Sequence, residues 1–104
     1  MKIPKKIKLF GCEYAIKQVN KVDDDNSLGK VFIDSGIIKL LKKDSKSYAG
    51  FDSIPEDKRK QVLLHELCHL MFYVISETEL YNNEKIVDNM ANCLMELIPQ
   101  LEGK

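Results

Sequence analysis

Residues 62–75 read VLLHELCHLMFYVI, and this stretch decides the fold that we expect. Its apolar residues recur at the 3.6-residue period of an α-helix, and they are too many for a helix with one face in water. We therefore predict a largely buried helix. The remaining strip carries His65, Glu66, His69 and Tyr73, and polar side chains on a buried helix need polar partners.

The two histidines in this stretch, which are the only ones in the chain, have a spacing that suits a metal site. Residues four apart in a helix lie one turn apart on the same face, so His65 and His69 can share one ion. Zinc accepts neutral imidazole nitrogens and, in catalytic sites, keeps one position for water. Glu66 stands beside both histidines and could deprotonate that water. The pattern predicts two zinc ligands and a general base.

A catalytic zinc site needs a third protein ligand, which here must be a carboxylate or a thiolate. Glu84 is the best candidate because it opens a second predicted helix. Asp88, one turn later, faces the same side and could accept the outer N–H of a ligand histidine. The alternative is that both acids are solvated helix residues. Cys68 points in another direction on its helix, and we expect it to fill the core.

The rest of the chain predicts one α+β domain over residues 1–104. Apolar runs interrupted by turn residues in the strand region, 1–50, predict an antiparallel β-meander of about four short strands. The region 53–98 should hold two packed helices that carry the metal site. Pro99 is expected to end the second helix.

Composition narrows the possible partners. The 104 residues are 44% hydrophobic and 31% charged, and 16 basic residues balance 16 acidic ones, so we expect no nucleic-acid partner. No apolar stretch approaches 18 residues, which argues against a membrane span. Lys8 and Glu13 interrupt any signal-peptide core, so we expect a cytoplasmic protein. The three cysteines match no disulfide framework or metal knuckle; reduced thiols are expected, with Cys93 in the core.

The two motifs resemble those of the gluzincins, the thermolysin-like clan of zinc metallopeptidases. In that family His-Glu-x-x-His is followed by Asn-Glu-x-x-x-Asp, and this chain has HELCH at 65–69 and NEKIVD at 83–88. The resemblance covers mainly residues 53–98. The whole chain is similar to the very small phage and prokaryotic members, the minigluzincins, in which a strand meander precedes two helices.

The resemblance implies a role for each residue of the two motifs. His65, His69 and Glu84 would bind Zn²⁺, Glu66 would act as general base and acid, and Asp88 would support a histidine ligand. The oxyanion of the transition state needs a further donor, which Tyr81 or Tyr73 could supply, and Tyr81 is the preferred candidate. Both tyrosines could instead simply cover the core.

Three functions therefore follow from the sequence as expectations. The first is a zinc endopeptidase, latent or narrow in its choice of peptide or protein substrate. The second is a zinc-binding interaction or regulatory module without proteolytic turnover. The third is a histidine network that serves the structure and binds no metal. The sequence leaves the oligomeric state open.

Overall fold

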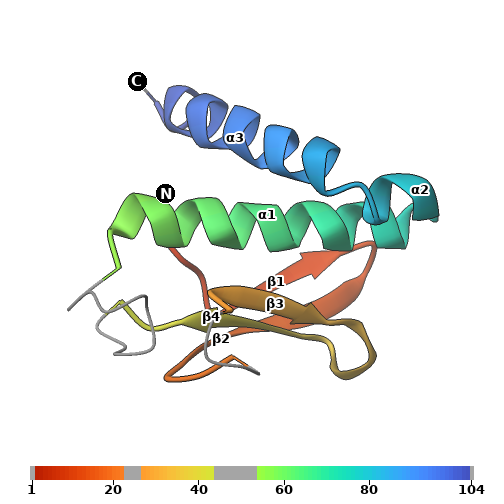
Figure 1. The fold of residues 1–104 in the computed structure, drawn as a ribbon, viewed down its shortest axis with the longest axis horizontal. Helices are drawn as coiled ribbons and strands as arrows, with labels where there is room; N and C mark the ends of the chain where they lie inside the picture. Colours follow the sequence, from red (N-terminus) through yellow and green to blue (C-terminus); the bar gives the residue numbers. More distant parts are fainter. Residues whose placement is uncertain (1, 23–26, 44–53, 104) are drawn as a thin grey trace.

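The chain folds into a four-stranded sheet followed by helices (Figure 1). The structure is a computed structural model, and it describes residues 2–22, 27–43 and 54–103. The α+β class is confirmed. The elements in chain order are β1 (Lys6–Leu9), β2 (Cys12–Val19), β3 (Gly29–Phe32), a 3-10 turn η1 (Ile33–Ser35), β4 (Ile37–Leu41), α1 (Glu56–Val74), α2 (Thr78–Tyr81) and α3 (Glu84–Leu101).

The predicted meander is wrong in its strand order. The sheet runs β1-β2-β4-β3, and β4 pairs parallel to β2 while the other neighbours pair antiparallel. The chain leaves β2, passes to the far edge to form β3, and returns to place β4 between them. Hydrophobicity explains this order: β4 reads IIKLL and buries Ile38, Leu40 and Leu41 almost completely, which a central strand allows. β3, with the sequence GKVF, takes the edge.

α1 is the central element of the molecule, with the sheet on one side and α3 on the other (Figure 1). This arrangement explains its numerous apolar residues, because two faces of the helix are buried. The core between α1 and the sheet contains the buried residues Tyr14, Ile16, Ile38, Leu40, Leu63 and Leu70. The core between α1 and α3 contains Leu64, Cys68, Val87 and Ala91.

The ends of the helices differ slightly from expectation. α1 begins at Glu56, directly after Pro55, whereas residue 53, where the predicted two-helix region starts, lies outside the described residues. α3 continues past Pro99 to Leu101, so the predicted end of this helix is wrong. The helix can continue because the φ of proline is compatible with a helix and only one backbone hydrogen bond is lost. Cys93 is exposed, so its predicted place in the core is wrong; α3 packs on one face only, and Cys93 lies off that face. No helix among the described residues is long and apolar enough to cross a membrane.

Candidate metal centre

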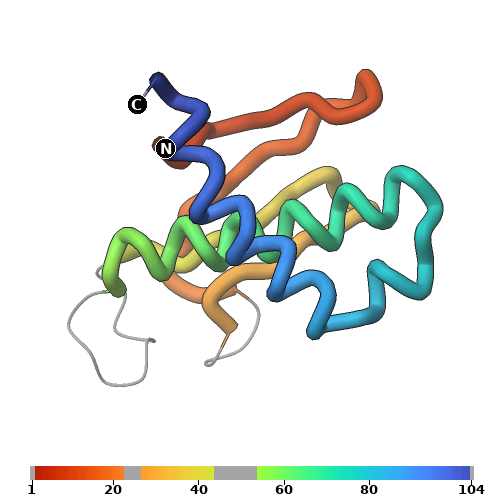
Figure 2. Tube along the Cα trace, turned by 90° about the horizontal axis from the view of Figure 1, so that it is seen from above, coloured from red at the N-terminus to blue at the C-terminus, as the bar shows by residue number. Residues whose placement is uncertain are grey.

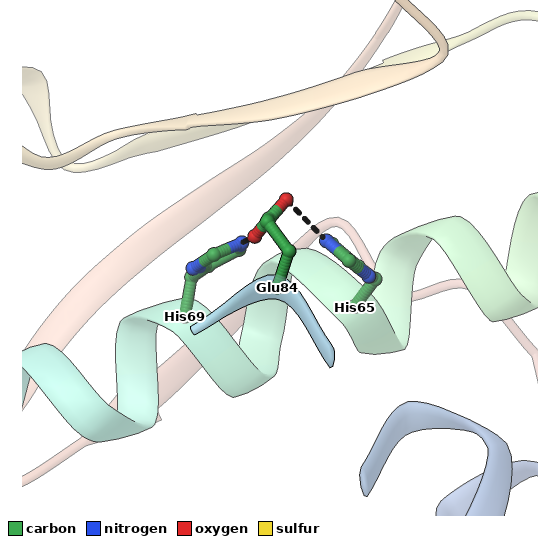
Figure 3. Close-up of side chains that lie close together, drawn as sticks. All are labelled: His65, His69 and Glu84. Carbon is green, nitrogen blue, oxygen red and sulfur yellow. Dashed lines mark ion pairs between the residues drawn. The ribbon is translucent and has the colours of Figure 1, made fainter. Parts of the chain in front are cut away.

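The predicted ligands converge at the start of α3. His65 and His69 extend from one side of α1, and the Glu84 carboxylate reaches them from the first turn of α3 (Figure 3). Glu84 Oε2 lies 2.8 Å from His69 Nε2, and Glu84 Oε1 lies 3.5 Å from His65 Nε2. One ligand atom from each of the three residues lies within 4.8 Å of the others. The three side chains could therefore hold one metal ion.

Local sequence explains how Glu84 comes to this position. α1 ends at Val74, α2 makes one short turn, and α3 then returns over α1 (Figure 2). Asn83 caps α3, with its side-chain oxygen accepting the Ile86 N–H at 3.1 Å. The cap fixes where α3 begins, so Glu84 occupies its first position and lies over the histidines.

Each histidine also has an oxygen partner on its other ring nitrogen. His65 Nδ1 lies 3.3 Å from Asp88 Oδ1, and His69 Nδ1 lies 2.7 Å from the backbone carbonyl of Tyr81. These acceptors favour a proton on Nδ1, which leaves the Nε2 lone pair directed at Glu84. In this tautomer, two lone pairs and a carboxylate facing one another would be stabilised by a cation among them. Either added protons or a metal ion can provide this positive charge, and the nitrogen and carboxylate ligand set suits zinc.

Glu66 borders the same space and is held in place by the sheet. Its Oε1 accepts the Val31 N–H of β3 at 3.1 Å. Burial raises the pKa of its carboxyl from 4.5 to about 7, against the opposing effects of His69 and of this hydrogen bond. A carboxylate with a pKa near neutrality can both take up and release a proton at physiological pH.

The space in front of these groups is an open hollow of about 410 Å³. Gly29 and Val31 of β3 line it on one side, and Glu66, His69 and Glu84 line it on the other. β3 approaches α1 closely here: a Cβ on Gly29 would lie 2.7 Å from a methyl carbon of Val62. Glycine thus permits the strand to border the site.

Tyr81, the preferred candidate for the oxyanion donor, lines this hollow. Its ring packs edge-on against His69, with the ring centroids 5.4 Å apart. Tyr73 is not among the residues that line this hollow. Its ring centroid lies 6.1 Å from that of Tyr81, and the residue is 51% exposed. Whether the Tyr81 hydroxyl serves an oxyanion stays a prediction.

Cys68 is buried, as the sequence predicts, although it lies inside the HELCH motif. Burial raises the pKa of its thiol to about 11, which keeps the thiol protonated and unsuited to bind zinc. Its environment is the apolar contact between α1 and α3.

Sequence reasoning missed three contributions to the site: the Val31 N–H, the Tyr81 carbonyl and the close approach at Gly29. The first two are backbone groups, which every residue carries, so no residue type marks them. For the close approach, the sequence offers one signal, the glycine at position 29 at the start of β3.

Comparisons with protein-family models, with curated proteins and with solved structures find no match to this chain.

Proposed function

We propose that this protein is a zinc metallo-endopeptidase. The observation that carries the proposal is the convergence of His65 Nε2, His69 Nε2 and the Glu84 carboxylate beside a second, buried carboxylate, that of Glu66. Three ligands plus an adjacent base is the arrangement that metal-assisted hydrolysis needs. The gluzincin-like motifs support the same chemistry.

Each residue then has a defined task. A zinc ion held by His65, His69 and Glu84 would polarise the scissile carbonyl and acidify a water molecule. Glu66 would take the proton of that water and later deliver it to the departing amine. Asp88 and the Tyr81 carbonyl hold the two imidazoles in the tautomer that keeps Nε2 free. The Tyr81 hydroxyl is our candidate donor to the oxyanion.

The position of β3 favours a peptide as substrate. β3 is an edge strand of the sheet, and it borders the hollow that contains Glu66, His69 and Glu84. An extended peptide can add to a sheet edge through main-chain hydrogen bonds, and along β3 it would have to compete with Glu66 for the Val31 N–H. A peptide lying along β3 would pass directly over the site. We place this peptidase in the cytosol, in keeping with its three unpaired cysteines.

The exposure of Glu84 favours one alternative. Its side chain is 69% exposed, and the hollow is open, so little of the described chain encloses a substrate. A zinc-binding interaction module without turnover fits such an open site, as does a peptidase that is latent or narrow in its substrates.

One experiment separates these functions. Zinc content is measured after gentle purification, and cleavage of a proteome-derived peptide library is followed by mass spectrometry for the native protein and Glu66→Gln. If the protein is a peptidase, the native protein and Glu66→Gln each bind about one zinc per chain, and only the native protein cleaves the peptides. Zinc without any cleavage by the native protein supports the interaction module. Absence of zinc from both forms supports the metal-free network and refutes the peptidase.

A further inference from the structure

α3 carries a second apolar stripe beside the face that packs on α1. Its members follow one another at spacings of three and four residues, as on one side of a helix: Ile86, Met90, Cys93, Leu97 and Leu101. The residues of α3 in the core with α1 form a different face: Val87, Ala91, Leu94 and Ile98. Leu97 and Leu101 are 49% and 81% exposed, and Cys93 and Met90 are exposed as well. This stripe is therefore apolar without being buried.

An apolar groove adjoins the N-terminal half of the stripe. Its volume is about 300 Å³, and Met90 of α3 lines it together with Phe72 and Ile75 at the end of α1 and Phe10 of the β1–β2 turn. α3 crosses α1 at an angle, so it leaves the C-terminal part of α1 uncovered here (Figure 2). None of the described residues that line the groove carries a charge. The Phe10 side chain is 72% exposed at its rim.

The stripe and the groove lie on the opposite side of the molecule from the candidate metal centre. At 3.6 residues per turn, Glu84 and Asp88 lie about 140–180° around α3 from Leu97. The groove adjoins the β1–β2 turn at one edge of the sheet, whereas β3 at the other edge borders the metal centre. A molecule bound to the stripe and the groove would leave the metal centre open.

The exposed apolar area of the stripe and the groove approaches that of a protein interface. Six large apolar side chains are exposed among the described residues, and only Tyr73 of these lies outside the stripe and the groove. The other five expose on the order of 600 Å², the upper end of the range of about 300–600 Å² for the largest apolar patch of a typical monomer. A standard-size interface covers about 800 Å² on each partner. The apolar residues alone supply most of that area.

We propose that the stripe and the groove bind a second copy of this chain, with the two α3 helices antiparallel. The groove lies beside the N-terminal half of α3, and the most exposed leucines, Leu97 and Leu101, lie in its C-terminal half. A two-fold axis therefore places the leucines of each copy at the groove of the other, which makes the surface complementary to itself. Because the groove lining has no charge, the pairing brings no like charges together there. The inference goes beyond the proposed function and does not depend on the metal.

Cys93 marks the centre of the proposed contact. It is the middle member of the stripe, so the two-fold axis passes close to it and the two Cys93 thiols meet. Cys12, the other exposed cysteine, does not line the groove.

Sedimentation velocity of the full chain in EDTA, which excludes dimers bridged by a metal, tests the contact. We expect a dimer. Leu97→Lys places a cation in the stripe and should raise the dissociation constant of the dimer at least about tenfold. Asn92→Lys places the same charge on the far side of α3 and should leave the dimer unchanged. Both residues are exposed, so both variants should fold, as circular dichroism can verify.

Chemical crosslinking tests the antiparallel arrangement. In Cys12→Ser, Cys93 is the one exposed cysteine that remains, and a short bis-maleimide should join two chains through it. Adding Leu97→Lys to this variant should abolish the covalent dimer.

Three results would overturn the proposal. The first is a native protein that stays monomeric from about 1 to about 100 µM. The second is a dimer that resists Leu97→Lys or gives no Cys93 crosslink, because it would use another surface or another arrangement. The third is a native monomer that binds phosphatidylcholine vesicles and loses this binding in Leu97→Lys, which would assign the stripe and the groove to a lipid surface.

Discussion

At the residue scale, Asp88 is the proposed supporting partner of the candidate ligand His65. Its Oδ1 lies 3.3 Å from His65 Nδ1 and accepts from Gln61 Nε2 at 3.1 Å, so it contacts the imidazole on the ring nitrogen that does not face Glu84. Loss of such a partner typically lowers metal affinity by about 10–100-fold. We expect a loss of this size in Asp88→Ala, measured by zinc competition with a chromophoric chelator. Asn89→Ala, an exposed neighbour on α3, is the matched control and should bind zinc as the native protein does. Unchanged zinc affinity in Asp88→Ala would contradict the role of Asp88.

The raised pKa of the Glu66 carboxyl predicts that the stability of the metal-free protein depends on pH. Because burial raises the pKa of this carboxyl from 4.5 to about 7, the folded state holds its proton more tightly than the unfolded state. The stabilisation is therefore fully present below about pH 4.5 and is lost as the pH rises through 7. Glu66→Gln stays neutral, so at pH 8 it should be more stable than the native protein, by on the order of 2–3 kcal/mol.

Urea unfolding in EDTA at pH 4.5 and pH 8 measures this effect of Glu66. Glu79→Gln, which changes an exposed glutamate on α2, is the control and should follow the native protein at both values. If Glu66→Gln shows the same difference in stability between the two pH values as the native protein, the carboxyl is not desolvated as described.

At the scale of elements, the contact between β3 and α1 depends on Gly29. A Cβ at this position would lie 2.7 Å from Val62 Cγ1 and 3.6 Å from Glu66 Cγ. In Gly29→Ala, the Val62 side chain or the strand must therefore shift, and we expect a loss of about 1–3 kcal/mol in the free energy of unfolding. Combining it with Val62→Ala removes the clashing methyl group. The double variant should lose less stability than the sum of the two single variants, as measured by urea unfolding. Strictly additive losses would show that the two residues are not in close contact.

The elements show what local sequence can and cannot predict. The 3.6-residue recurrence of apolar side chains in residues 62–75 predicts a buried helix, because a helix that is buried on two faces needs apolar residues on both of them. The number of strands also follows from the apolar runs and turns. Strand order does not, because a meander and the observed β1-β2-β4-β3 order use the same strands and differ only in which neighbours pair. The high share of apolar residues in the β4 sequence IIKLL is the one sequence feature that indicates a central strand.

At the scale of the whole molecule, the candidate metal centre joins parts that are far apart in the chain. The histidines come from α1, Glu84 from α3, and the bond to Glu66 from β3. Motif spacing predicts the side chains of this set because nitrogen and carboxylate ligands are limited to a few residue types. The supporting carbonyl of Tyr81 and the N–H of Val31 depend on how α2 and β3 pack against α1, which only the folded structure reveals.

The central claim is that His65, His69 and Glu84 bind one zinc ion. Anomalous X-ray diffraction at the zinc edge, from crystals of the protein purified without added chelator, tests it most directly. We predict one strong peak per chain, about 2.0–2.2 Å from His65 Nε2, His69 Nε2 and a carboxylate oxygen of Glu84. A zinc-supplemented crystal with no peak between these residues, or with its only peak elsewhere on the chain, would contradict the account.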